Sequence, residues 1–163
     1  TSGTIQKHIG IGDVIITSGA VRIDGASTHY APIEYPAVAN YKILNVLIKA
    51  SEILKVPYHI GITASSDTFY PGQERYDSYS KYVIRKFQGS LKEWQKLNVL
   101  NYEMEASTLL TICNVLGLQG GCITGVIVNR VISEHISKKD LNLGENNAIK
   151  VATKAVKMFV SEE

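Results

Sequence analysis

The chain has 163 residues, 45% of them hydrophobic and 20% charged, and this composition fits one globular domain while excluding disordered and fibrous classes. The formal net charge is only +2 and the basic residues are scattered, so the sequence predicts neither nucleic acid nor a membrane surface as a partner. No apolar run nears the roughly 18 residues that cross a bilayer and the first residues lack a signal-peptide layout, so we expect a cytoplasmic protein.

The predicted elements alternate along the chain. The opening, Thr1-Ser2-Gly3, has no initiator Met and carries loop chemistry, which indicates a fragment of a longer protein. Strands are then expected at 13–23, 58–65, 99–104 and 121–129, where short β-branched runs are typical of strands covered on both faces. Helices are expected at 40–54, 90–97, 105–116 and 146–160. This alternation predicts a parallel or mixed sheet flanked by helices.

Local signals set the expected helix ends. Ser90 and Glu93 are spaced as a capping box, and Gly117 suits the C-cap of the helix before it. The stretch 131–147 is polar and weakly patterned, so we expect a mobile flap or loop there.

Polar motifs follow three of the predicted strands. SSDTFYPGQER follows the strand ending near Ser65, EMEAS spans a strand and the next helix, and Asn129-Arg130 follows the last strand. Ligands bind outside the carboxyl ends of the strands in such sheets. We therefore expect these three regions to converge on one rim.

The nine residues FYPGQERYD raise the question of their ligand. Phe69 offers a flat apolar surface, Gln73 a donor and an acceptor, and Arg75 a rigid fork of donors. A planar ring with carbonyl oxygens and an N–H, such as uracil, would satisfy all three. The competing interpretation is a solvated turn in which Arg75 is exposed.

Glu105 begins a predicted helix directly after Met104. Its carboxylate could accept hydrogen bonds from the two neighbouring hydroxyls of a ribose and stabilise positive charge on the sugar, with Met104 against the sugar face. Alternatively Glu105 only complements the helix dipole and Met104 belongs to the core.

The remaining motifs predict no cofactor. Gly10-Ile11-Gly12 does not complete a dinucleotide fingerprint, and the four histidines are too dispersed to favour a metal site. Cys113 and Cys122 lie in apolar surroundings and are expected to be buried, reduced thiols.

Four ordered stretches, DGASTHYAPIEYPA (24–37), TASSDTFYPGQERYD (63–77), NYEMEASTLLTIC (101–113) and GVIVNR (125–130), resemble the bacterial uridine phosphorylases of the nucleoside phosphorylase family. The resemblance implies an α/β fold, a three-layer α/β/α sandwich with a central mixed β-sheet. Residues 1–163 would form a single domain, the C-terminal two-thirds of the family domain, lacking its N-terminal part.

The resemblance also implies an activity: reversible phosphorolysis of uridine to uracil and ribose 1-phosphate, with inorganic phosphate as co-substrate and no organic cofactor. Arg75, Arg130 and Glu105 would be catalytic, with Arg130 behind Gln73 and Arg75 to orient them. The implied substrate-binding set is Thr1, Phe69, Gln73, Arg75, Glu103, Met104, Glu105, Ile127 and Val128. The implied assembly is a homo-oligomer, dimers forming a hexamer.

The departures from the family pattern leave alternatives open. The family's phosphate-binding glycine and arginine and its structural monovalent-cation site belong to a preceding segment, so residues 1–163 alone are expected to be inactive. A purine nucleoside phosphorylase typically has an Asp after the last strand, where this chain has Asn129-Arg130. That favours uridine, while a hydrolase of the same fold and a non-catalytic nucleoside-binding fragment remain as alternatives.

Overall fold

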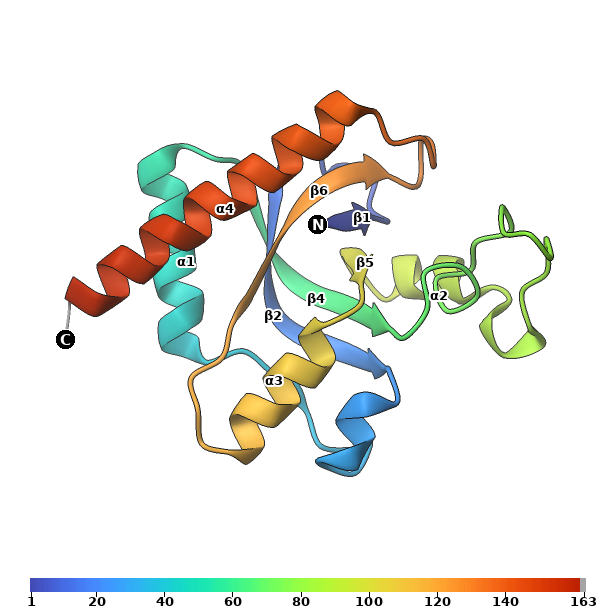
Figure 1. The fold of residues 1–163 in the computed structure, drawn as a ribbon, viewed down its shortest axis with the longest axis horizontal. Coiled ribbons are helices and arrows are strands. Elements are labelled where there is room, and N and C mark those ends of the chain that lie inside the picture. Colours follow the sequence, from blue (N-terminus) through green and yellow to red (C-terminus); the bar gives the residue numbers. More distant parts are fainter. Residues whose placement is uncertain (162–163) are drawn as a thin grey trace.

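A mixed six-stranded sheet forms the centre of the molecule in the computed structural model, which describes residues 1–161 (Figure 1). The strands are β1 (Ser2–Thr4), β2 (Val14–Ile23), β3 (Ala37–Val38), β4 (Tyr58–Ser66), β5 (Asn101–Glu103) and β6 (Cys122–Asn129). Their order is β3-β2-β4-β5-β1-β6, and β2 also pairs with β6. The sheet therefore curls until its edge strand β6 pairs with β2 and closes a five-stranded ring, with β3 outside it.

The pairing is parallel for β2–β4, β4–β5 and β1–β6, and antiparallel for β1–β5, β2–β3 and β2–β6. The first half of β2, Val14 to Thr17, is buried throughout, because its side chains face packed neighbours on both sides. The predicted α/β fold with a mixed sheet is thus confirmed.

Helices pack around this sheet. They are α1 (Tyr41–Leu54), α2 (Ser90–Lys96), α3 (Ala106–Val115) and α4 (Lys138–Ser161), with 3-10 turns η1 (Ala26–His29) and η2 (Arg85–Phe87). α1 and α4 lie together on one side of the sheet, and α3 lies on another (Figure 1). The cluster that joins α1 and α4 to β2 is Ile16, Val46, Leu47, Ala50, Val151 and Ala155.

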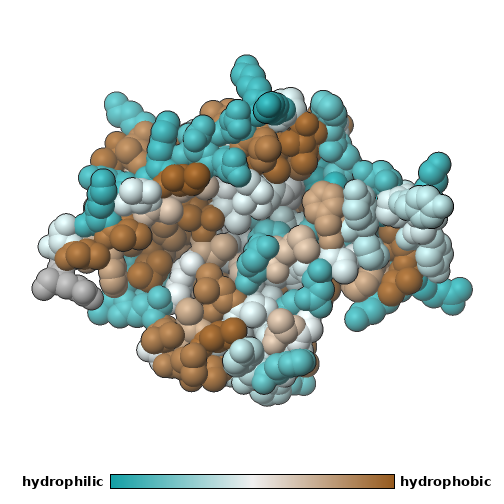
Figure 2. Space-filling model, viewed as in Figure 1, coloured by the Kyte–Doolittle hydropathy of each residue, from teal (hydrophilic) through white to brown (hydrophobic). Residues whose placement is uncertain are grey.

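Some apolar side chains remain at the surface. Figure 2 shows several groups of them on this face, one of which lies around the outer end of α3, where Leu116 and Leu118 are 60% and 57% exposed. Within residues 1–161, no helix combines the length and the apolar character required to cross a membrane.

The expected flap at 131–147 is wrong in its second half, because α4 already begins at Lys138. Ser137 caps it: its hydroxyl contacts the Asp140 carboxylate at 2.6 Å and accepts from the Asp140 N–H at 3.1 Å. Gly144 is buried against the backbone of β6. Close packing at this glycine, rather than an apolar stripe, therefore holds the polar first turns of α4. Only 131–137 remain as a connection.

The opening residues Thr1-Ser2-Gly3 are also not the loop that their composition predicts. Ser2 and Gly3 belong to β1, which lies between β5 and β6 in the sheet. Small polar residues suit this position because Ser2 Oγ finds a buried partner, Thr124 Oγ1, at 2.9 Å.

The predicted capping box at the start of α2 is wrong as well. Gly89 is the N-cap residue and makes no side-chain cap, while the Ser90 hydroxyl is buried without a partner among the described residues. Glu74 supplies the acceptor instead: its carboxylate binds the N–H groups of Gly89 at 2.5 Å and Leu91 at 2.7 Å. A residue fifteen positions away in sequence thus caps the helix.

Candidate active site

A cavity of about 190 Å³ lies where β1, β5 and β6 meet the loop after β4. Two of the three polar regions expected to share one rim, the loop after β4 and the segment around Glu105, converge there, whereas Asn129-Arg130 is not part of the lining. The lining residues are Thr1, Ser2, Gly3, Phe69, Gln73, Arg75, Tyr102, Glu103, Met104, Glu105, Ile127, Val128 and Ile136. All nine members of the predicted substrate-binding set are among them, whereas Arg130 lies behind the wall.

The loop after β4 is folded tightly enough to hold its side chains in place. The Arg75 N–H donates to the Tyr70 carbonyl at 2.8 Å, and the Gly72 N–H donates to Thr68 Oγ1 at 2.9 Å. A Cβ on Gly72 would lie 2.5 Å from Ser66 Oγ, so the close approach of the chain requires glycine. Phe69, Gln73 and Arg75 are thereby presented to one cavity.

Arg75 is buried, and the interpretation of this loop as a solvated turn with an exposed arginine is therefore wrong. Arg75 as a whole is 5% exposed, and its guanidinium carbon lies 4.2 Å from the centre of the Phe69 ring. Burial and the neighbouring Arg130 charge lower the pKa of Arg75, and the carboxylate of Glu134, which accepts from Arg75 Nη1, opposes both effects.

Arg130 supports this wall from the far side. Its Nη2 donates to the Gln73 carbonyl at 2.9 Å, its Nε donates to Glu134 at 2.7 Å, and its guanidinium lies 5.3 Å from the Tyr102 ring centre. Arg130 touches the backbone of Gln73 and shares a carboxylate with Arg75. It is therefore placed to hold these two residues rather than to contact a ligand in the cavity directly.

Asn129 turns away from the cavity. Its amide nitrogen donates to the carbonyl oxygens of Gln6 at 3.1 Å and Ile9 at 2.9 Å. The side chain at this position thus joins β6 to the segment after β1 and has a structural role.

Glu103 and Glu105 lie two residues apart but have different environments. Glu103 is buried at the end of β5, and its carboxylate accepts from the N–H groups of Glu105 at 2.8 Å and Ala106 at 2.7 Å, and from Ser65 Oγ. Burial raises the pKa of Glu103 and these hydrogen bonds reduce the rise. Glu103 therefore caps α3 and fixes the backbone of Glu105.

Glu105 is the N-cap residue of α3, and its own carboxylate is exposed at the cavity. One of its oxygens accepts from the Met104 N–H at 3.2 Å. The helix dipole favours the charged form of a carboxylate at a helix N-terminus. The lone pairs of Glu105 that the Met104 N–H does not use can accept hydrogen bonds from a hydroxyl-rich ligand.

A second buried carboxylate, Asp24, lies beneath the start of α3. It accepts from Thr108 Oγ1 at 2.8 Å, from the Ser27 N–H at 2.6 Å and from the hydroxyls of Ser107 and Ser27. Burial by itself would raise the pKa of Asp24, but these hydrogen bonds outweigh burial and lower it. Asp24 and Glu103 together anchor the helix that carries Glu105.

Sequence reasoning missed Glu134, whose carboxylate joins the two site arginines. An acid four residues after Arg130 was the available signal, but it falls in a polar stretch where acids are ordinary. Ile136, Tyr102, Ser2 and Gly3 were also missed as lining residues.

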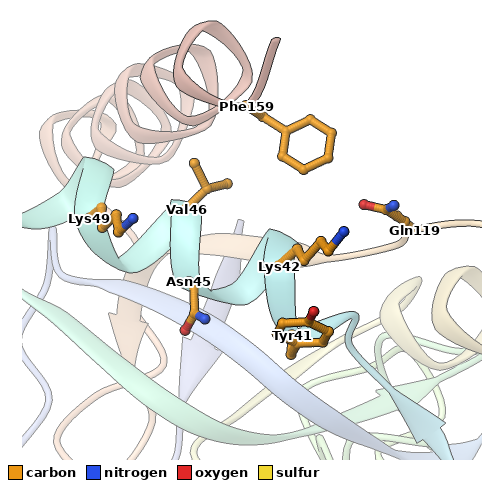
Figure 3. A pocket seen from close by; sticks show the side chains of 7 residues that line it. All are labelled: Tyr41, Lys42, Asn45, Val46, Lys49, Gln119 and Phe159. Carbon is orange, nitrogen blue, oxygen red and sulfur yellow. The ribbon is translucent and has the colours of Figure 1, made fainter. Parts of the chain in front are cut away.

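A larger cavity of about 340 Å³ lies between α1 and Phe159 of α4 (Figure 3). The side chains around it are Tyr41, Lys42, Asn45, Val46, Lys49, Gln119 and Phe159. None of the motifs that follow the strands contributes to it, so size alone does not mark the site.

The cysteines and histidines lie outside the site cavity. Cys113 and Cys122 are both free and partly buried, and burial raises the pKa of Cys122 to about 11, so its thiol stays protonated at neutral pH. His59 Nε2 lies 2.9 Å from Asp13 Oδ2, beside the ring of His8. Within residues 1–161, no group of three or more His, Cys, Asp or Glu side chains could hold a metal ion.

Comparisons with known proteins place these residues in a family context. Residues 1–161 match the model of the phosphorylase superfamily. The chain is 52% identical over 161 residues to uridine phosphorylase of Haemophilus influenzae, covering 99% of this chain and 64% of that protein. It is 50% identical over 160 residues to uridine phosphorylase of Escherichia coli, covering 98% and 63%, and 44% identical over 159 residues to that of Thermococcus kodakarensis, covering 98% and 55%. The chain thus spans less than two thirds of the length of these relatives.

Proposed function

Because the chain belongs to the phosphorylase superfamily, we propose that it carries the base-binding and ribose-binding part of an enzyme that splits uridine with inorganic phosphate. The observation that carries this proposal is the single cavity in which Phe69, Gln73 and Arg75 face Glu105. An aromatic face, an amide and a guanidinium recognise uracil, and a carboxylate recognises the ribose hydroxyls. The names of the relatives at about 50% identity support the same substrate.

The base would lie against Phe69, with its carbonyl oxygens and N3–H toward Gln73 and Arg75. Phe69 is 41% exposed, which leaves ring surface for contact with a ligand. A buried guanidinium next to the base is worth more in the transition state than in the ground state, since negative charge grows on the uracil oxygens as the base departs. Gln73 sets the orientation of the ring.

The ribose would lie between Met104 and Glu105. The Glu105 carboxylate accepts from the ribose hydroxyls and opposes the positive charge that develops at the sugar's anomeric carbon. Thr1, which lines the same cavity, would contact the sugar and the incoming phosphate. Ile127 and Val128 close the wall on the β6 side.

In the reaction, a phosphate oxygen forms a bond to the anomeric carbon as the bond to N1 of uracil breaks. The electron pair of the broken bond passes to the uracil ring and its oxygens, where Arg75 stabilises it. Uracil then takes up one proton and leaves, and ribose 1-phosphate remains. No organic cofactor takes part in this scheme.

The test is phosphate-dependent release of uracil by the purified full-length protein that contains these residues, followed by chromatography, since residues 1–163 alone are expected to be inactive. Uracil should be released from uridine only when phosphate is present. Equal release without phosphate would indicate a hydrolase, and activity on inosine instead of uridine would indicate a purine enzyme. Binding without turnover would indicate a nucleoside-binding protein.

We also propose that the enzyme works in the cytoplasm as a homo-oligomer of dimers that form a hexamer. The exposed apolar side chains at the outer end of α3 support association. Sedimentation velocity on the full chain would test it, and a monomer at micromolar concentration would contradict it.

A further inference from the structure

Of the side chains that the structure describes, Glu134 is the one that forms ion pairs with both arginines of the site. Its Oε2 accepts from Arg75 Nη1 and its Oε1 accepts from Arg130 Nε at 2.7 Å. The side chains of Arg75 and Arg130 are 4% and 1% exposed, and that of Glu134 is 39% exposed. A carboxylate on the short connection between β6 and α4 therefore bridges two buried guanidiniums from different parts of the chain.

The Glu134 carboxylate offsets the repulsion between the two arginine charges. Two like charges buried side by side repel each other, and burial removes the water that would weaken the repulsion. The other contacts of Arg75 are to the face of the Phe69 ring, which favours a stacked position but does not fix rotation within the plane. Its Nε is buried without a partner in the described part of the chain. Among residues 1–161, Glu134 is thus the only contact that fixes the direction of the Arg75 fork.

We propose that Glu134 is a positioning residue for uracil binding, which holds the Arg75 guanidinium so that its donors face the departing base. The inference rests on the proposed function. The Glu134 carboxylate occupies one donor nitrogen of Arg75 and offsets part of the guanidinium charge. The remaining donors, however, are already oriented when the base becomes an anion. A preorganised donor needs no rearrangement at that moment. Arg130, held by the same carboxylate and by Gln73, keeps Glu134 in place.

The test compares Glu134→Ala and Glu134→Gln with Glu145→Ala, which replaces an exposed glutamate on α4, each in the full-length protein. The substrates are uridine and 5-fluorouridine. Fluorine withdraws electrons and makes uracil a better leaving group, so turnover of 5-fluorouridine depends less on a well-placed Arg75. A role in folding alone would lower the active fraction and reduce both rates by the same factor.

We expect Glu134→Ala to lower kcat/KM for uridine by about 10- to 100-fold and kcat/KM for 5-fluorouridine by less. The ratio of the 5-fluorouridine value to the uridine value should therefore rise about 3- to 10-fold. Glu134→Gln keeps one acceptor oxygen and should change the ratio in the same direction by a smaller factor, and it provides the measurement if the alanine variant does not fold. Glu145→Ala should leave both values unchanged.

Two results would overturn the inference in distinguishable ways. If the unaltered protein releases uracil but the ratio stays constant in both Glu134 variants, Glu134 does not position Arg75, and the proposed function stands. If the unaltered full-length protein releases no uracil from uridine with phosphate, the proposed function fails and the inference fails with it.

Discussion

Arg75 combines three features at the scale of a single residue: a buried guanidinium, a ring beneath it and a carboxylate at its side. We expect Arg75→Ala to lower kcat/KM for uridine by about 10- to 200-fold, since the charge on departing uracil would lose its main donor. Arg75→Lys should restore little of this activity, because a single ammonium cannot reproduce the fork. Exposed Arg85 offers the matched control. Steady-state kinetics decide, and an unchanged kcat/KM in Arg75→Ala would exclude a role at the base.

Glu105 differs from Glu103 in that its carboxylate faces the cavity rather than the backbone of α3. Glu105→Gln keeps the shape of the side chain and removes the charge that opposes a positive sugar. We expect kcat to fall by about 10- to 100-fold with a smaller change in KM, as happens when a contact matters mainly in the transition state. If KM rises and kcat is unchanged, Glu105 contributes equally to the bound substrate and the transition state, and its electrostatic role is wrong.

At the scale of elements, α3 depends on Asp24, a carboxylate from the segment after β2. The lowered pKa of Asp24 means that its charged form is favoured in the folded protein. The stabilisation is therefore present above the ordinary pKa of 3.8 and is lost as pH falls through the lower folded value. We expect Asp24→Asn to reduce the free energy of unfolding by about 1–3 kcal/mol at neutral pH. Urea unfolding at several pH values should show this difference shrinking below about pH 4, and a difference that grows there would contradict it.

α4 and β6 approach each other through two glycines. A Cβ on Gly125 would lie 1.9 Å from the carbonyl oxygen of Gly144, and this contact leaves no room for any side chain. We expect Gly125→Ala to lower the free energy of unfolding by roughly 2–4 kcal/mol. Gly10→Ala is the matched control, since its Cβ would lie 3.4 Å from the Asp13 carboxylate, an ordinary contact. Similar melting temperatures for the two variants would show that α4 can move away from β6 at little cost.

Sequence patterns predicted well the elements whose residues carry the pattern for their own structure. β2, β4, β6 and α1 carry their own β-branched runs or apolar periods, so their bounds agree with the structure to within a residue or two. The first turns of α4 could not be recognised in this way, because they are held by Gly144 packing on β6 rather than by an apolar face. The Ser90 and Glu93 spacing misled for the same reason, as Glu74 lies far from α2 in sequence.

The site shows the same division. Phe69, Gln73, Arg75 and Glu105 follow strand ends, and the topology of an α/β sheet brings strand ends together, so their convergence could be predicted. Glu134 could not, because what distinguishes it is the pair of buried arginines that it reaches. The capping role of Glu103 was hidden likewise, since its partners are backbone N–H groups that any sequence possesses.

At the scale of the whole molecule, the curled sheet encloses a belt of polar side chains. Ser2 Oγ contacts Thr124 Oγ1 at 2.9 Å, and Asn101 Nδ2 donates to the same oxygen at 3.2 Å. Asn101 Oδ1 accepts from Thr63 Oγ1 at 2.8 Å, which in turn contacts Thr17 Oγ1 at 2.8 Å. All five residues are buried, and they come one each from β1, β6, β5, β4 and β2. The belt therefore joins every strand of the closed part of the sheet.

Asn101 occupies the centre of this belt, and its removal would take one hydrogen-bond partner from each of two buried hydroxyls, those of Thr63 and Thr124. We expect Asn101→Ala to lower the free energy of unfolding by about 2–4 kcal/mol, from lost hydrogen bonds and the space left behind. Thr63→Val alone should also be destabilising, because it removes the donor to Asn101. Once Asn101 is absent, however, Thr63→Val removes a hydroxyl that has already lost one partner, so the double variant should be more stable than the sum of the single effects by about 0.5–3 kcal/mol. Urea unfolding of the four proteins measures this coupling, with exposed Asn45→Ala as a control that should change stability by less than about 0.5 kcal/mol. Additivity to within about 0.3 kcal/mol would mean that the strands are joined independently and that the belt does not act as one network.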